Sequence, residues 1–225
     1  MKKRLGCLHA HYSNINYIEK ALSSYDIDLV HFVDPALMYR VTSDKSFKKR
    51  EAQYKVREQL EWISKSKVDA ILITCTNYIT LLQGEQLSIS VPIINIDEPY
   101  FNEICKITEP QILLFTNPLT VEGTMNRLHK YADTRGLTLD TEVFVINDIF
   151  ELMMQGKKNV YDEEVTTFIT QLMKENPKTV SVAQLSMVDA AMKVERELSK
   201  TLVNPLNTLV DVLVKQLELV RTKEK

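Results

Sequence analysis

The chain has 225 residues and is poor in the features that mark several common classes of protein. It contains five glycines, and neither GxGxxG nor GxxxxGK[ST] occurs, so dinucleotide and P-loop nucleotide binding lose their main sequence support. Three cysteines at distant positions argue against a disulfide framework and against a zinc site built from cysteine pairs. The four histidines form no HExxH pattern and do not pair with the cysteines in sequence. We therefore expect no metal ion.

Charge of one sign and long apolar runs are also missing. The formal net charge of −2 gives no electrostatic reason to expect nucleic acid or an anionic membrane as a partner. No apolar run approaches the roughly 18 residues of a membrane span, and Leu5–Ala10 is too short for a signal sequence. Apolar residues at 44% and charged residues at 26% are typical of globular proteins. We expect a cytoplasmic protein that binds neither nucleic acid nor membranes.

Short apolar runs alternate with segments of helical periodicity along the chain, which predicts an α/β fold. The pattern repeats: Leu5–Leu22 resembles Leu113–Tyr131 as strand, polar turn and helix, and two further strand regions also correspond. The sequence therefore predicts two pseudo-symmetric lobes, each a parallel sheet of about four strands flanked by helices, with an active-site cleft between them. The predicted parts are a first lobe at 1–108, a second lobe at 109–203 and a C-terminal helix within 204–225 that packs on the body.

The segment Ala70–Ile79 is the most informative. Its first four residues form an apolar run of the kind buried on both faces of a parallel sheet, and small polar residues follow before helical spacing resumes. Cys75 is therefore expected at the carboxyl end of a strand, on the turn into a helix, which is where open α/β sheets bind ligands. A helix start offers N–H groups that favour a thiolate or a bound carboxylate.

Four motifs in this order resemble the aspartate/glutamate/hydantoin racemase superfamily: Thr74-Cys75-Thr76-Asn77, Ile96-Asp97-Glu98-Pro99, Phe115-Thr116-Asn117-Pro118-Leu119-Thr120 and Ala183-Gln184-Leu185-Ser186-Met187. The resemblance implies a cofactor-independent isomerase in which two cysteines, one per lobe, exchange protons on opposite faces of the substrate α-carbon. It also implies a small carboxylate or amino-acid substrate and a possible homodimer.

The resemblance carries over residue by residue. It makes Cys75 the first-lobe catalytic cysteine, and it places the second cysteine position at Gln184. The residues expected to bind the substrate are Thr74, Thr76, Asn77, Thr116, Asn117, Thr120, Gln184 and Ser186.

Gln184 departs from the pattern, because a carboxamide has no accessible pKa and cannot act as a general acid or base. Three interpretations follow. Cys75 alone could perform one-base chemistry, such as isomerisation or decarboxylation with protonation on one face. A group on the first turn, His9, His11 or Tyr12, could replace the missing acid or base. Alternatively, the chain could be a non-catalytic protein that binds small carboxylates.

Overall fold

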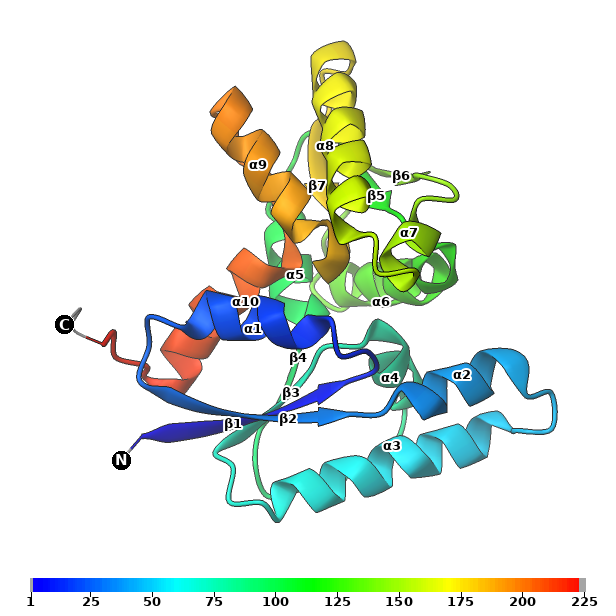
Figure 1. Cartoon of the computed structure of the whole chain (residues 1–225), viewed down its shortest axis with the longest axis vertical. Helices are drawn as coiled ribbons and strands as arrows, with labels where there is room; N and C mark the ends of the chain where they lie inside the picture. The colour runs from blue at the N-terminus through cyan, green and yellow to red at the C-terminus, as the bar shows by residue number, and fades with distance from the viewer. Residues whose placement is uncertain (1, 223–225) are drawn as a thin grey trace. The chain divides into compact units, whose positions relative to one another are not determined.

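The computed structural model describes residues 2–222. The chain divides into two compact units, one made of Met1–Glu98 with Val210–Lys225 and the other of Pro99–Leu209. Each unit contains one parallel sheet with helices beside it, as the alternating sequence pattern predicts (Figure 1). Among residues 2–222, no helix is both long enough and apolar enough to cross a membrane.

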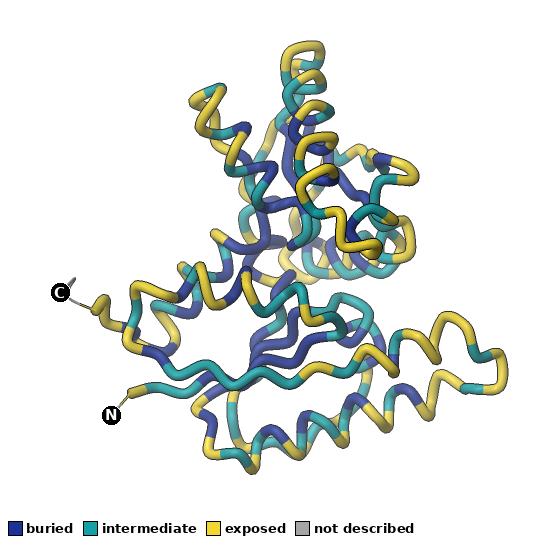
Figure 2. Tube along the Cα trace, in the orientation of Figure 1, coloured by how far each residue is buried: buried dark blue, intermediate teal, exposed yellow. Residues whose placement is uncertain are grey.

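The first unit has a four-stranded parallel sheet in the order β2-β1-β3-β4. Its elements are β1 (Lys3–His9), α1 (Asn14–Leu22), β2 (Ile27–Val33), α2 (Pro35–Ser43), α3 (Lys49–Ser64), β3 (Ala70–Ile73), α4 (Thr76–Leu81) and β4 (Ile93–Asn95). The inner strands β1 and β3 carry the buried core, and β3 is buried along its whole length (Figure 2).

Helices α1 and α3 cover opposite faces of this sheet (Figure 1). The α3 face explains the glycine in β1, because a Cβ at Gly6 would lie 2.6 Å from Ile63 Cγ2. Helix α2 begins with a common helix-start pair: Pro35 lies in its first turn, and the Asp34 carboxylate accepts a hydrogen bond from Leu37 N at 3.1 Å. The end of the chain returns to this unit, where Thr222 N donates to Ser24 O at 2.9 Å.

The second unit has a three-stranded parallel sheet in the order β6-β5-β7. Its elements are α5 (Asp97–Ile104), β5 (Gln111–Phe115), η1 (Pro118–Thr120), α6 (Val121–Asp133), β6 (Thr141–Val145), α7 (Phe150–Met154), α8 (Lys158–Glu175), β7 (Thr179–Val182), η2 (Leu185–Met187), α9 (Val188–Leu198) and α10 (Pro205–Leu217). The first two residues of α5 and the last eight of α10 fall in the first unit.

Alternation along β5 divides the second core into two layers. Ile112 and Leu114 pack with residues of α8 and α9, whereas Leu113 and Phe115 pack with residues of α5 and α6. The predicted lobe boundary lay after residue 108, but the compact units divide ten residues earlier. The reason is that α5 supplies core residues to the second sheet, among them Tyr100, whose hydroxyl donates to Ser181 Oγ at 3.2 Å.

Candidate active site

The turn after β3 carries Cys75, as predicted from the sequence. Cys75 has an extended backbone (φ −107°, ψ 112°) and directly precedes α4. Its side chain is half-buried, and so are those of Thr76 and Asn77. The start of α4 is fixed by Tyr78, whose buried hydroxyl donates to Asp34 O at 2.5 Å. The end of β3 and the hydrogen-bonded start of α4 therefore hold the thiol in place.

The electrostatic environment of Cys75 favours the neutral thiol. Burial raises the pKa of Cys75 to about 11, and the Asp97 carboxylate adds to this effect. The backbone N–H groups of Tyr78 and Asn77 act in the opposite direction, but they are outweighed. At neutral pH the group is therefore a neutral thiol, and the thiolate that the sequence predicted from the helix start is not its resting form, because burial outweighs the N–H groups.

Thr74, immediately before Cys75, is buried and joins β3 to the end of β1. Its hydroxyl lies 2.8 Å from His9 Nδ1, donates to Leu8 O at 3.2 Å and accepts from Asn14 Nδ2 at 3.2 Å. His9 is fully buried, and its pKa is lowered to about 3, first by burial and then by His31. His9 is therefore neutral, and its contact with this turn runs through Thr74.

His11 and Tyr12 lie on the loop after β1. Because β1 and β3 are parallel neighbours, this loop is at the same sheet edge as Cys75. His11 is half-buried, with Nδ1 2.8 Å from Ser13 Oγ, and burial lowers its pKa. Tyr12 is 66% exposed, and its ring centroid lies 4.3 Å from that of His11. That His11 or Tyr12 acts as a second acid or base stays a prediction.

In the second unit, the side chain of Gln184 fills the turn where the sequence predicts carboxylate binding. Gln184 Oε1 accepts from Thr116 N at 2.6 Å, from Thr116 Oγ1 at 3.0 Å and from Asn117 N at 3.0 Å. Gln184 Nε2 donates to Thr120 Oγ1 at 2.8 Å. Two backbone N–H groups on Oε1 fix which end of the amide is oxygen. The amide oxygen thus takes three donors of the two residues, Thr116 and Asn117, that the sequence predicts to bind the substrate.

Tyr161 on α8 is a polar contact of this turn that the sequence did not reveal. Its buried hydroxyl lies 2.8 Å from Thr116 Oγ1 and donates to Ser186 Oγ at 2.9 Å. Burial raises the pKa of Tyr161 to about 12, so it stays a neutral phenol. The only available signal was that a buried tyrosine needs a hydrogen-bond partner. Tyr161 links two predicted binding residues, Thr116 and Ser186.

The expectation that no histidine pairs with a cysteine does not hold in space. Cys7 on β1 is paired in register with His31 on β2, and His9 follows two residues later on the same face. The sulfur of Cys7 and one ring nitrogen from each histidine lie within 4.8 Å of one another. Sequence spacing could not show this group, because its members come from two strands.

Comparison with known proteins identifies solved structures that have a similar fold. No family model matches the chain, and no curated protein matches it in sequence. Among solved structures, the chain is similar to an aspartate racemase from Picrophilus torridus, with a TM-score of 0.70, 13% identity and coverage of 98% of this chain and 96% of that one. An allantoin racemase from Klebsiella pneumoniae gives a TM-score of 0.66 at 18% identity, covering 99% and 91%.

A glutamate racemase from Francisella tularensis subsp. tularensis, solved in complex with D-glutamate, gives a TM-score of 0.63 at 11% identity, covering 99% of this chain and 85% of that one. The resemblance inferred from the four sequence motifs is confirmed at the level of the fold: two parallel sheets of four and three strands, flanked by helices.

Proposed function

We propose that the chain is a cofactor-independent enzyme that transfers a proton at the α-carbon of a small carboxylate or amino-acid-like substrate, with Cys75 as its single catalytic thiol. The observation that carries the proposal is the half-buried thiol at the carboxyl end of an inner strand, in a fold shared with racemases of small acids. The bound D-glutamate of one similar protein supports a substrate of this class.

The protonation state of Cys75 supports one-face chemistry. Since burial raises the pKa of Cys75 to about 11, the resting enzyme offers a proton. An α-carbanion forms when the minor thiolate form of Cys75 removes the α-proton and becomes a thiol, which exchanges its proton with solvent, or when the substrate carboxylate leaves as CO₂ beside the resting thiol. The carbanion takes the thiol proton through a new C–H bond, and water then reprotonates the thiolate. Gln184 has no proton to exchange at the opposite face, so the product keeps one configuration.

Substrate binding is assigned to the polar groups around the two turns. Thr76 and Asn77 accompany the thiol on the first unit. We propose that Thr116, Thr120 and Ser186 of the second unit bind the same substrate, with Gln184 as a hydrogen-bonding group in place of a second thiol. The amide oxygen of Gln184 must then share its donors with the carboxylate or release them.

Hydrogen exchange in D₂O tests the reaction. A panel of amino acids and dicarboxylates is incubated with the wild-type protein and with Cys75→Ala, and deuterium at the α-carbon is followed by NMR. The expected result is uptake with one class of acid, reduced about 10²–10⁴-fold in Cys75→Ala, the usual contribution of a positioned general acid. Cys105→Ala is the matched control and keeps the wild-type rate. Uptake that is equal in wild type and Cys75→Ala would contradict the proposal.

A second candidate function is binding without turnover, and the engagement of Gln184 favours it. The amide oxygen already satisfies the donors at Thr116 and Asn117, as expected of a site that needs no second proton carrier. Calorimetric titration with the same acids separates the two functions. Binding that survives Cys75→Ala with no deuterium exchange would identify a binding protein.

A further inference from the structure

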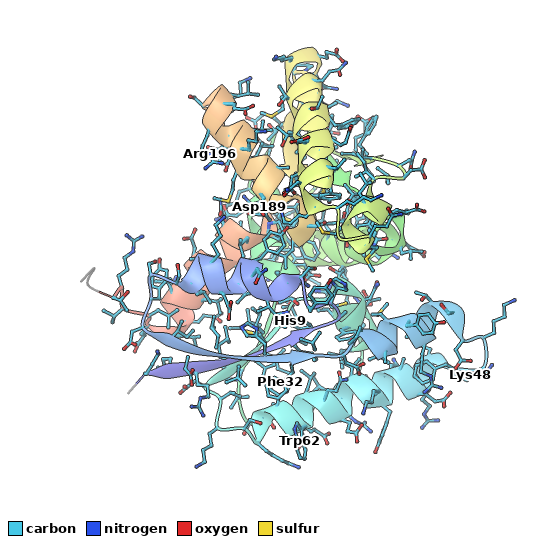
Figure 3. The ribbon with its side chains drawn as sticks, in the orientation of Figure 1. His9, Phe32, Lys48, Trp62, Asp189 and Arg196 are labelled. Atoms are coloured by element: carbon cyan, nitrogen blue, oxygen red, sulfur yellow. The ribbon has the colours of Figure 1, made fainter. Side chains whose placement is uncertain are left out.

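The buried face between the first sheet and α1 holds a cluster of potential metal ligands outside the candidate active site. Cys7 and His31 are paired in register across β1 and β2. His9, which is labelled in Figure 3, lies two residues after Cys7 on the same face of β1. We propose that Cys7 Sγ, His9 Nε2 and His31 Nδ1 bind a divalent transition-metal ion of the zinc class. This proposal does not depend on the function proposed for Cys75.

The two imidazole rings already have the orientation that such a site needs. His9 Nε2 and His31 Nδ1 are 2.8 Å apart, so these two nitrogens point toward a common position. The sulfur of Cys7 completes a group in which all three ligand atoms lie within 4.8 Å of one another. The ligand atoms of one tetrahedral zinc ion lie about 2.0–2.3 Å from the metal. Their separation from one another is therefore longer than 2.8 Å and shorter than 4.8 Å. Small side-chain rotations therefore bring the three atoms to one ion.

The outer nitrogen of His9 has an acceptor of the kind that metal-bound histidines use, and that of His31 is buried without a hydrogen-bond partner among the described residues, with a carboxylate nearby. Such a histidine donates its other ring N–H to a carboxylate, a carbonyl or a comparable acceptor, which fixes its tautomer. His9 Nδ1 lies 2.8 Å from Thr74 Oγ1, and the Thr74 hydroxyl in turn donates to Leu8 O. His31 Nε2 lies 3.8 Å from Glu19 Oε1 on α1. Both rings can therefore carry their proton outward and present a lone pair inward.

The donor set selects the class of metal. Thiolate and imidazole ligands suit zinc and related transition metals, whereas magnesium and calcium prefer oxygen. One thiolate and a nearby carboxylate, that of Glu19, would balance the charge of a divalent ion in this buried position. The sulfur of Cys7 has only a weak contact, with Leu5 O at 3.9 Å, to give up on binding.

Cobalt titration of the full chain, after treatment with a chelator, tests the site. Cobalt(II) bound by a cysteine gives a sulfur-to-metal charge-transfer band in the near ultraviolet. We expect this band to saturate at one equivalent, to disappear when zinc is added in excess, and to be absent in Cys7→Ser. Cys105→Ser is the matched control, because its thiol lies outside the cluster, and it keeps the band. No band with the folded wild-type chain, or a band that Cys7→Ser retains, would overturn the proposal.

Two further measurements guard against a variant that merely misfolds. Zinc should raise the melting temperature of the wild-type chain and of Cys105→Ser. This measurement needs no substitution at Cys7, His9 or His31. Glu19→Ala, at an exposed position on α1, should weaken cobalt binding about 10–100-fold, the usual effect of losing the acceptor behind a metal-bound histidine. A wild-type melting temperature that zinc leaves unchanged would identify the histidines as a hydrogen-bonded pair of the core.

Discussion

The turns after β3 and after β7 occupy corresponding places in the two units, but they hold different kinds of side chain. Cys75 follows β3, is half-buried and keeps its thiol proton at neutral pH. Gln184 follows β7, and its amide is engaged by Thr116, Asn117 and Thr120. The same strand-to-helix turn thus presents a neutral thiol in one unit and a hydrogen-bonded amide in the other. The comparison teaches that this geometry positions a side chain without deciding its chemistry.

The largest expected effect comes from making the two turns alike. Gln184→Cys puts a second thiol in the second-unit turn, so protons could be exchanged on both faces of an α-carbon. We expect Gln184→Cys to racemise an acid in which the wild type only exchanges the α-proton for deuterium. The rate of racemisation, measured by chiral chromatography, should be about 10²–10⁴-fold above that of wild type. Ser186→Cys is the matched control, with a thiol two residues away, and should not racemise. Retention of configuration in Gln184→Cys, with deuterium exchange intact, would refute a shared substrate.

The pH dependence of Cys75 alkylation tests the first-unit side of the comparison, the protonation state of the thiol. Its pKa is raised from 9.0 to about 11, a difference of about two units, so near neutral pH it has about 100-fold less thiolate than an ordinary cysteine. In a Cys105→Ser background, we expect alkylation of Cys75 by iodoacetamide to keep rising tenfold per pH unit beyond pH 9. Peptide mass spectrometry gives the rate. Levelling off below pH 9 would show that the N–H groups of Tyr78 and Asn77 outweigh burial.

Opening the second-unit turn should have a smaller effect, on stability. Gln184→Ala removes the acceptor of Thr116 N and Asn117 N, and leaving buried donors unpaired costs about 1–3 kcal/mol. We expect a lower melting temperature that malonate or succinate partly restores by binding the vacated donors. Gln171→Ala, which removes an exposed amide on α8, is the control and should change little. Restoration of Gln171→Ala by the same acids would indicate a general salt effect.

The smallest effect compares one tyrosine from each unit. Tyr161→Phe removes hydroxyl contacts to Thr116 and Ser186, and Tyr78→Phe removes the bond to Asp34 O. Each variant should lose about 1 kcal/mol in the free energy of unfolding, the net contribution of a typical hydrogen bond, measured by urea denaturation. Tyr161→Phe should also weaken carboxylate binding if Thr116 takes part in it. An equal loss of binding in Tyr78→Phe would mean that both changes act through stability alone.

Much of the fold was predictable because it follows from local patterns. The apolar run Ala70–Ile73 forms a fully buried inner strand, and the helical spacing that resumes after the Cys75 turn forms α4. The sequence analysis did not show where this helix ends, which is at Leu81. The segment beyond Leu81 has polar residues and Gly84 at positive φ, which end a helix, and apolar spacing alone did not reveal this.

The candidate site was only partly predictable, because side-chain partners come from residues distant in sequence. The sequence located the turn of Cys75. It did not show that Thr74 would form a hydrogen bond with His9, which is 65 residues earlier. It placed Gln184 at the position of the missing second cysteine, but it did not reveal that Thr116, at the end of β5, would donate a hydrogen bond to the amide. Strand register brought Cys7 to His31, and no motif encodes that pairing.

The division of the chain also bears on the order in which the molecule can fold during synthesis. The second unit, Pro99–Leu209, is continuous, whereas the first needs Val210–Lys225 as well as Met1–Glu98. Thr222 N, bonded to Ser24 O, is synthesised after every residue of the second unit. Domains usually fold from the N-terminus onward as they emerge. Here the unit that carries Cys75 begins first, but its later segment follows the whole of Pro99–Leu209, so the continuous unit can complete its fold before the first unit does.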